Sequence, residues 1–426
     1  MGSLRMGLSK VTITPPIGVR LSGYADRIQP SIGILDDLYA RALVIDDGEE
    51  RAAIVICDLL GLTNSLVKDI RSRVRELTGI EDENIMVTAT HTHCGPDLRF
   101  AGEAYIESLK SQVAGAVYAA CNNMREVRIG VGRGECFVGC NRRNPKSPYG
   151  PYYLYSWPEG PMDPTVLVLR IEDLSGRILG ILINYSCHPV TLGPRELRIS
   201  RDYPGYALEV LEKIFGRDIV AIFMNGFCGN INPNWIWDKP ELSPPPPRSF
   251  PESLEERLKE TRRLGHILGA EALKVAESIT NFISETRLKV KRKELSLPVR
   301  KDIPERMLKF IRESKPNQLN YERYQKILKG EDILTEVQAI AINDIAIVGC
   351  PGEVFVEFQL EIRRRSPYKY TFLSELANDS IGYLPVASAY DEGGYEPTAT
   401  VLAREAGEKL TKAAIELLME ISHNPS

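Results

Sequence analysis

The apolar positions of the chain alternate between short runs typical of strands and longer stripes typical of helices. Residues 40–58, ARALVIDDGEERAAIVICD, predict two strands joined at Asp47-Gly48, because two apolar runs flank a dipeptide that favours turns. Further strands are expected at residues 84–90, 127–131, 165–171, 178–185, 219–224, 286–297 and 369–373. Helices are expected at residues 65–77, 105–124, 203–215, 252–284 and 402–421, with one or two more within residues 303–328 and another that ends near residue 365.

Hairpins among these elements predict sheets of mixed direction. TEVQAIAINDIAIVGC has a turn signal at Asn343-Asp344, and DLSGR separates the strands at residues 165–171 and 178–185. The pattern therefore favours an α/β fold with mixed β-sheets and flanking helices, and we expect residues 1–426 to form one elaborated domain. Residues 377–400 are expected to be a long polar and aromatic loop.

A proline-rich segment interrupts the regular pattern at residues 235–251, WIWDKPELSPPPPRSFP. Consecutive prolines fix φ and remove backbone donors, so the segment is predicted to be a loop and is a candidate lid. Trp235 and Trp237 either line a substrate site or anchor this loop to the body of the protein.

Composition narrows the class of protein. A hydrophobic fraction of 43%, a charged fraction of 26% and a net charge of -4 are ordinary for a globular protein and give no reason to expect nucleic acid as a partner. No apolar run is long enough for a membrane span, and the N-terminus MGSLRMGLSK lacks an apolar signal region, so we expect a cytoplasmic protein. The eight cysteines form no CxxC pair and are expected to be reduced. The oligomeric state stays open.

Four short polar motifs each follow an apolar strand. They are His91-Thr92-His93, His188-Pro189, residues 226–234 and Pro351-Gly352-Glu353. Active sites gather at strand ends, where loops direct side chains inward from a rigid base, so the shared pattern predicts one pocket. Three of the chain's five histidines fall in these motifs.

The two histidines of the first motif are expected on one side of the backbone, because strand side chains alternate with a period of two. That arrangement suits a metal site, or one metal ligand beside one proton-transfer group, although a hydrogen-bonded structural pair is equally common. With His188 and Glu353 added, the set matches the way catalytic zinc is held. Glu353 is otherwise an acidic residue in the first turn of a helix.

Three further polar residues can be explained by a structural role. Asp202 could cap the helix that follows it. Asp58 could orient a histidine or cap a turn. Cys228 could be a nucleophile, but a buried thiol is favoured because no base adjoins it in sequence.

Ordered motifs resemble the catalytic N-terminal domain of the neutral/alkaline non-lysosomal ceramidase family. They are VTITPPIGVRLSGYADR, ARALVIDDGEERAAIVICDL, THTHCGP, NRRNPKSPY, MDPTVLVLRIED, INYSCHPVTL, SRDYPGYA, PGEVF and YEPTAT. The resemblance implies a zinc-dependent hydrolase that uses metal-activated water on an amide (N-acyl) bond, with a small-molecule N-acyl or related substrate. It implies one Zn²⁺ per chain, with the ligands His91, His188, Glu353 and Tyr383.

The resemblance also implies residues that act on the substrate carbonyl. His93 would donate a hydrogen bond or move a proton, and Tyr395 and Arg142 would lie near the carbonyl oxygen, although Arg143 adjoins Arg142 in the motif. Asn232 occupies the position of a family serine implicated in catalysis, which puts ceramide specificity in doubt.

Two further features separate the chain from the family pattern. We expect the chain to lack the family's C-terminal β domain and to have no secretion signal, and we therefore expect a substrate other than membrane ceramide. The alternatives are a non-catalytic protein that keeps the metal pocket for binding, and an ester or phosphoester hydrolase on the same site.

Overall fold

A computed structural model describes residues 2–234, 253–312 and 320–423. The proline-rich segment 235–251, with Trp235 and Trp237, lies outside these residues. A large mixed sheet has the strand order β12-β10-β9-β7-β2-β4-β5-β6. In chain order its strands are β2 (Arg5–Thr12), β4 (Tyr39–Asp46), β5 (Arg51–Cys57), β6 (Ile85–Ala89), β7 (Arg125–Glu135), β9 (Thr165–Asp173), β10 (Ile178–Tyr185) and β12 (Val220–Asn225).

A smaller sheet packs against one face of the large one. Its strands, in spatial order, are β15 (Leu288–Leu297), β16 (Ile333–Ile342), β17 (Ile345–Gly349) and β19 (Tyr370–Ser374). Apolar side chains of both sheets form one buried cluster between them, including Leu43 and Ile54 from the large sheet and Ile340 and Phe372 from the small one. Strand side chains alternate between faces, so Ala339 and Ala341 point to the opposite side, toward a helix.

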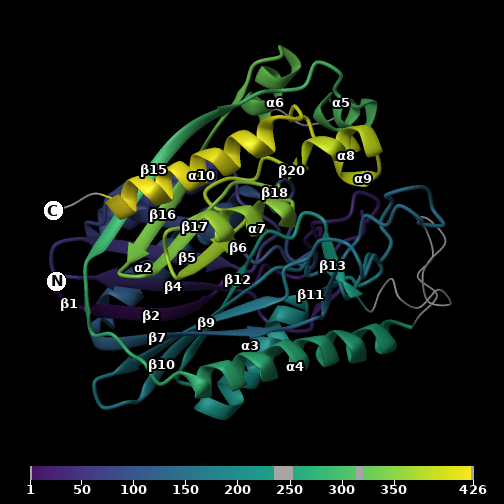
Figure 1. The fold of residues 1–426 in the computed structure, drawn as a ribbon. Coiled ribbons are helices and arrows are strands. Elements are labelled where there is room, and N and C mark those ends of the chain that lie inside the picture. The colour runs from purple at the N-terminus through teal and green to yellow at the C-terminus, as the bar shows by residue number, and fades with distance from the viewer. Residues whose placement is uncertain (1, 235–252, 313–319, 424–426) are drawn as a thin grey trace.

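Helices cover the outer faces of both sheets (Figure 1). The long C-terminal helix α10 (Ala406–His423) packs on the small sheet. On the large sheet, α1 (Asn64–Thr78) and α2 (Glu103–Asn122) cover one half, and α3 (Asp202–Phe215) and α4 (Leu254–Ser278) cover the other. The layers are therefore helix, sheet, sheet and helix, which confirms the predicted α/β fold with mixed sheets and flanking helices.

Glycines on β7 allow α4 to approach the sheet. Gly130, Gly132 and Gly134 alternate along the strand and so share one face. A Cβ atom on Gly132 would lie 2.6 Å from Cγ1 of Val275 on α4, closer than carbon atoms pack. The sequence therefore fixes the helix-to-sheet distance through residues that carry no side chain.

Several expected boundaries were wrong. Helix α4 ends at Ser278, before residue 284, and α10 begins only at Ala406. The expected loop at residues 377–400 contains β20 (Tyr383–Leu384), α8 (Ala387–Glu392) and α9 (Tyr395–Thr398). Such short elements show no apolar periodicity of their own, and tertiary contacts hold them in place. The turn at Asn343 was predicted correctly, since its φ is 52°.

The remaining elements are short and lie mainly near one end of the sheets. The helices are η1 (Asp82–Asn84), α5 (Glu305–Arg312), α6 (Tyr321–Leu328) and α7 (Val356–Arg365). The strands are β1 (Gly2–Ser3), β3 (Gly33–Ile34), β8 (Gly139–Asn141), β11 (Arg198–Ile199), β13 (Ile231–Pro233), β14 (Glu285–Thr286) and β18 (Glu353–Val354). All eight cysteines are free thiols, as predicted. Among the described residues, no helix is long and apolar enough to cross a membrane.

Candidate metal centre and active site

The candidate site forms where the two edge strands of the large sheet, β6 and β12, come together. They stand at opposite ends of the strand order, but β2 and β7 pair only at Arg5–Glu126 and Met6–Arg125, so the sheet can bend between them. The side chain of Asn225, at the end of β12, donates a hydrogen bond to the carbonyl of Thr90, just after β6. The loops that follow β6, β10 and β12 therefore meet at one place.

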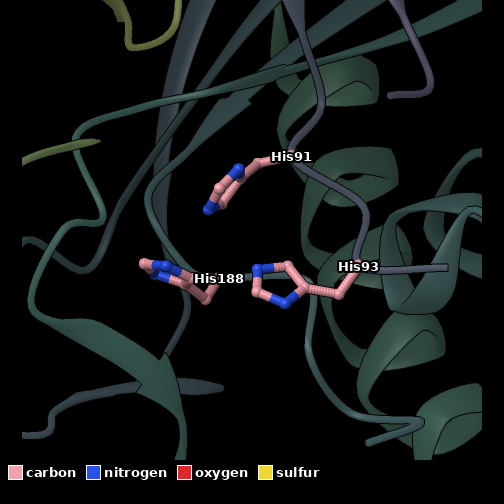
Figure 2. Close-up of side chains that lie close together, drawn as sticks. All are labelled: His91, His93 and His188. Carbon is pink, nitrogen blue, oxygen red and sulfur yellow. The ribbon is translucent and has the colours of Figure 1, made fainter. Parts of the chain in front are cut away.

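His91 lies in a turn rather than at the end of the strand. Strand β6 ends at Ala89, and His91 has a φ of 68°, an uncommon value for a residue with a side chain. The rings of His91 and His93 are 4.9 Å apart and nearly perpendicular. The expectation that both rings share one side holds, but the expected reason, strand alternation, was wrong. Figure 2 shows the rings of His91 and His93, from one loop, close to the ring of His188, from another part of the chain.

Backbone carbonyls fix two of the three imidazole rings. Nδ1 of His91 lies 2.7 Å from the carbonyl of Leu60, and Nδ1 of His188 lies 2.6 Å from the carbonyl of Cys228. A carbonyl only accepts hydrogen bonds, so each Nδ1 carries the proton. In the neutral rings, both Nε2 atoms then keep their lone pairs, which is the form that binds metal.

Glu353 brings a carboxylate to the same point. Its Oε2 lies 3.3 Å from Nε2 of His91 and 3.2 Å from Nε2 of His188. Glu353 belongs to β18, which pairs with β20 so that Glu353 stands opposite Tyr383. The alternative that Glu353 occupies the first turn of a helix was wrong, because α7 begins only at Val356.

These distances fit a cation between the three atoms. Two unprotonated nitrogens and a carboxylate oxygen are all acceptors, and acceptors approach one another closely only around a proton or a metal ion. Ligand atoms of a tetrahedral zinc site with bonds of about 2.0–2.1 Å are about 3.3 Å apart. The residues therefore fit a zinc-sized ion. The ring nitrogens of His91, His93 and His188 also lie within 4.8 Å of one another and could hold a metal ion.

Electrostatics couple the carboxylate to the two rings. Burial by itself would raise the pKa of Glu353, but the charge and hydrogen bonds of His91 and His188 lower it well below its usual value. Burial and the positive charge of Arg142 lower the pKa of His188 to about 3. Glu353 therefore stays ionised and His188 stays neutral at physiological pH. Burial opposes protonation of His91, but the charge and hydrogen bond of Glu353 raise its pKa above the usual value, so His91 is the ring that favours a proton while no metal is bound.

His93 is buried but has unused ring nitrogens. Neither nitrogen has a hydrogen-bond partner among the described residues, and burial together with the neighbouring His91 and His188 lowers the ring's pKa well below its usual value. Tyr24 packs edge-on against the ring at 5.0 Å, and a Cβ on Gly23 would lie 2.4 Å from its Nδ1. The neutral ring is thus held in place while its polar atoms remain available.

Arg142 and Arg143 both contact Glu396 but differ in their other partners. Nη1 of Arg142 donates to Oδ1 of Asn232 at 2.9 Å, and its guanidinium lies over the ring of Tyr383. The second guanidinium nitrogen of Arg143, Nη2, instead contacts Glu392 at 3.0 Å. Arg142 is therefore the arginine beside the Glu353–Tyr383 strand pair. Its placement near a substrate carbonyl stays a prediction.

Both tyrosines of the final loop stand next to this arginine. The rings of Tyr383 and Tyr395 are 5.7 Å apart, and the guanidinium of Arg142 lies 5.5 Å from the Tyr383 ring and 5.9 Å from the Tyr395 ring. Burial raises the pKa of Tyr383 well above its usual value, the charge of Glu353 adds to this effect, and the charge of Arg142 opposes it.

Comparison with known proteins identifies the family of this chain. The family described as neutral/alkaline non-lysosomal ceramidase, N-terminal, matches residues 4–241, more than half of the chain. The chain belongs to this family. It is similar to curated proteins named neutral ceramidase, with 26% identity to that of Drosophila pseudoobscura over 56% of this chain and 37% of that protein. For the one from Pseudomonas aeruginosa the identity is 27%, over 67% of this chain and 46% of that protein.

Solved structures show the same fold. The crystal structure of neutral ceramidase from Pseudomonas aeruginosa matches with a TM-score of 0.79 at 20% identity, over 100% of this chain and 76% of that one. A structure titled as ceramidase complexed with C2 matches with a TM-score of 0.78. The chain spans less than half the length of these two curated relatives, whereas it covers three quarters of the crystallised chain.

Within this member of the ceramidase family, two of the open alternatives were wrong. Asp58 neither orients a histidine nor caps a turn, because Oδ2 accepts from Arg41 at 2.7 Å and from the backbone of Tyr39. Asp202 is the first residue of α3, and Oδ2 accepts from the backbone of Leu192 at 3.1 Å. It therefore ties the loop after His188 to the start of α3.

Sequence reasoning missed two buried glutamates of the site. Glu396 is fully buried and accepts hydrogen bonds from Arg142 at 2.7 Å and from Arg143 at 2.8 Å. Glu375 follows β19 and accepts a hydrogen bond from the thiol of Cys228 at 2.8 Å. Cys228 is fully buried, as the favoured interpretation predicted. A polar residue directly after the apolar strand β19 was the available signal for Glu375, the same signal that led to the histidines.

Proposed function

We propose that this protein is a zinc-dependent hydrolase that cleaves an amide (N-acyl) bond. The observation that carries the proposal is the approach of Oε2 of Glu353 to Nε2 of both His91 and His188, with both Nδ1 atoms held by backbone carbonyls. In this proposal His91, His188, Glu353 and Tyr383 hold one Zn²⁺ per chain. A bound zinc ion supplies Lewis acidity and activates water at neutral pH.

The remaining residues act on the substrate in this proposal. The N–H of neutral His93 donates to the carbonyl oxygen, or its free nitrogen moves a proton from water to the departing amine nitrogen. Tyr395 donates a second hydrogen bond to the same oxygen. Arg142 donates a hydrogen bond to Asn232 and lies over the ring of Tyr383, and so keeps both side chains in position. Burial of His91, His93 and His188 excludes water, which strengthens each of these interactions.

The proposed substrate class rests on the names of the similar proteins and on Asn232, which differs from the family pattern. The similar curated proteins are named neutral ceramidases, which makes an N-acyl bond the first choice of target. In this chain the amide oxygen of Asn232 accepts from Arg142, at the position where the family pattern has a serine. We therefore propose a small-molecule N-acyl substrate other than membrane ceramide.

A metal analysis combined with a substrate panel tests the proposal. We expect about one zinc per chain in the purified protein and hydrolysis of N-acyl amides that a chelator abolishes and zinc restores. His91→Ala and Glu353→Ala should each lose the metal, whereas His266→Ala, an exposed histidine of α4, should keep both metal and activity. Protein that contains no stoichiometric metal would contradict the proposal.

The same panel separates the alternatives. Tight binding of N-acyl compounds without turnover would instead indicate a binding protein. Turnover of matched esters or phosphoesters, but not of amides, would indicate a different hydrolase on the same site.

A further inference from the structure

Arg306 extends the candidate site toward the surface. It lies on the amphipathic helix α5, which Figure 1 shows beside α8 and α9, and its guanidinium carbon is 4.9 Å from the ring centre of Tyr395. Burial raises the pKa of Tyr395, and the positive charge of Arg306 opposes this rise. Tyr395 in turn lies against Tyr383, the partner of Glu353 in the β18–β20 pair. The exposed positive charge of Arg306 is therefore separated from Tyr383, a candidate metal ligand, only by the side chain of Tyr395.

Several arginines around this end of the protein pair with carboxylates. Arg142 and Arg143 share Glu396, Arg300 pairs with Asp302, Arg312 with Glu305 and Arg404 with Asp391. Arg306 has no carboxylate within ion-pair distance among the described residues, although it stands in the same neighbourhood. Its charge is thus available to a ligand.

The chemistry of a guanidinium limits the kinds of ligand that Arg306 can bind. Its planar set of N–H donors matches the oxygens of a carboxylate or a phosphate and binds them with two parallel hydrogen bonds. In a substrate with a fatty acyl group, that group is hydrocarbon, and the anionic group then belongs to the amine portion.

We propose that Arg306 is a specificity-determining residue that selects N-acyl substrates with an anionic group on the amine portion. This inference rests on the proposed amide hydrolysis and names its substrate class. In the reaction, water adds a hydroxyl group to the acyl carbon and a proton to the nitrogen as the C–N bond breaks. The products are a fatty acid and an amine that carries the anionic group.

Matched substrates test the charge alone. N-dodecanoylglycine and N-dodecanoylglycinamide share the acyl chain and the scissile amide, and differ only in a carboxylate against a neutral amide. A second pair, N-dodecanoyl-O-phosphoethanolamine and N-dodecanoylethanolamine, tests a phosphate in the same way. We expect the wild-type protein to prefer the anionic member of at least one pair by about tenfold in kcat/KM, mainly through KM. The pair that shows the preference identifies the anion.

Variants assign the preference to Arg306. Arg306→Gln should reduce the ratio of kcat/KM between anionic and neutral substrates to about one, and Arg306→Lys should restore part of it. Arg312→Gln is the matched control, because it removes an exposed arginine from the same helix that already pairs with Glu305, and it should leave the ratio unchanged.

Equilibrium binding keeps this inference separate from the hydrolytic activity. The Kd of each compound for chelator-treated protein should show the same dependence on Arg306. A binding preference that Arg306→Gln removes, without any turnover, would support the anion site and contradict the hydrolase. Metal-dependent turnover with equal rates on both members of each pair would support the hydrolase and overturn the anion site. Equal loss of the preference in Arg306→Gln and Arg312→Gln would also overturn it.

Discussion

The thiol of Cys228 donates a hydrogen bond to Oε1 of Glu375, 2.8 Å away. The backbone N–H of Cys228 donates to the other carboxylate oxygen at 2.9 Å, and the carbonyl of Cys228 accepts from His188. Glu375 therefore supports the loop that orients a candidate metal ligand.

The ionisation of Glu375 should make the stability of the metal-free protein depend on pH. Burial raises its pKa to about 7, whereas an unfolded glutamate titrates near about 4.3. Between these pH values the folded state binds more protons than the unfolded state. Stability is therefore greatest below the lower value and falls as the pH rises through 7, by about 4 kcal/mol at most.

Urea denaturation of chelator-treated protein at pH 5 and pH 8 measures the slope of the unfolding free energy against pH. Glu375→Gln should flatten it, and Glu331→Gln, which changes an exposed glutamate, should not. An unchanged slope in Glu375→Gln would assign the pH dependence to other groups.

Replacement of His91 and His93 should have different consequences. His91→Ala should remove the metal, since Nε2 of His91 faces Glu353. His93→Ala should retain the metal and lower kcat by about 10²–10⁴-fold, the usual contribution of a general acid or base. Metal content and turnover, measured on the same samples, check both outcomes. Equal loss of metal in the two variants would make His93 a ligand.

Loss of the Glu396 charge should destabilise the protein. Glu396→Gln would leave Arg142 and Arg143, each 4% exposed, without their shared carboxylate, and removal of one partner of a buried pair costs about 3–5 kcal/mol. Glu392→Gln is the control, because Glu392 is 31% exposed and pairs with Arg143 alone, so the expected loss is below about 1 kcal/mol. Chemical denaturation compares the two. Similar losses would show that Glu396 has no special role in holding the arginines.

Two glycine substitutions should have opposite effects. Gly132→Ala places a Cβ 2.6 Å from Val275 and should cost about 1–3 kcal/mol through overpacking between β7 and α4. Gly115→Ala lies within α2, has no atom within 4 Å of the added Cβ, and should stabilise the protein by up to about 1 kcal/mol. Thermal or urea unfolding of both variants measures the difference. A destabilising Gly115→Ala would contradict this account of helix propensity.

The sequence pattern predicted an element correctly wherever that helix or strand has a clear apolar periodicity of its own. The strands of the hairpin at residues 40–58 and the helix at residues 65–77 have clear apolar periodicity, and their observed bounds differ from the predicted ones by one or two residues. The helices α8 and α9 were missed, because four to six residues carry no such period and depend on their surroundings. The left-handed backbone of His91 was also outside the reach of pattern, since a favourable turn residue such as glycine is absent there.

The sequence by itself determined the alternation of strands and helices and the donor groups at strand ends, because side-chain period and residue chemistry are local properties. Only the tertiary structure decided which donors meet. His91 and His188 follow strands from opposite halves of one sheet, and their rings are 4.7 Å apart because the sheet bends and the small sheet packs across its apolar face. Glu353 reaches them through its pairing with Tyr383. Burial of distant apolar faces brings these segments together, and no local pattern records it.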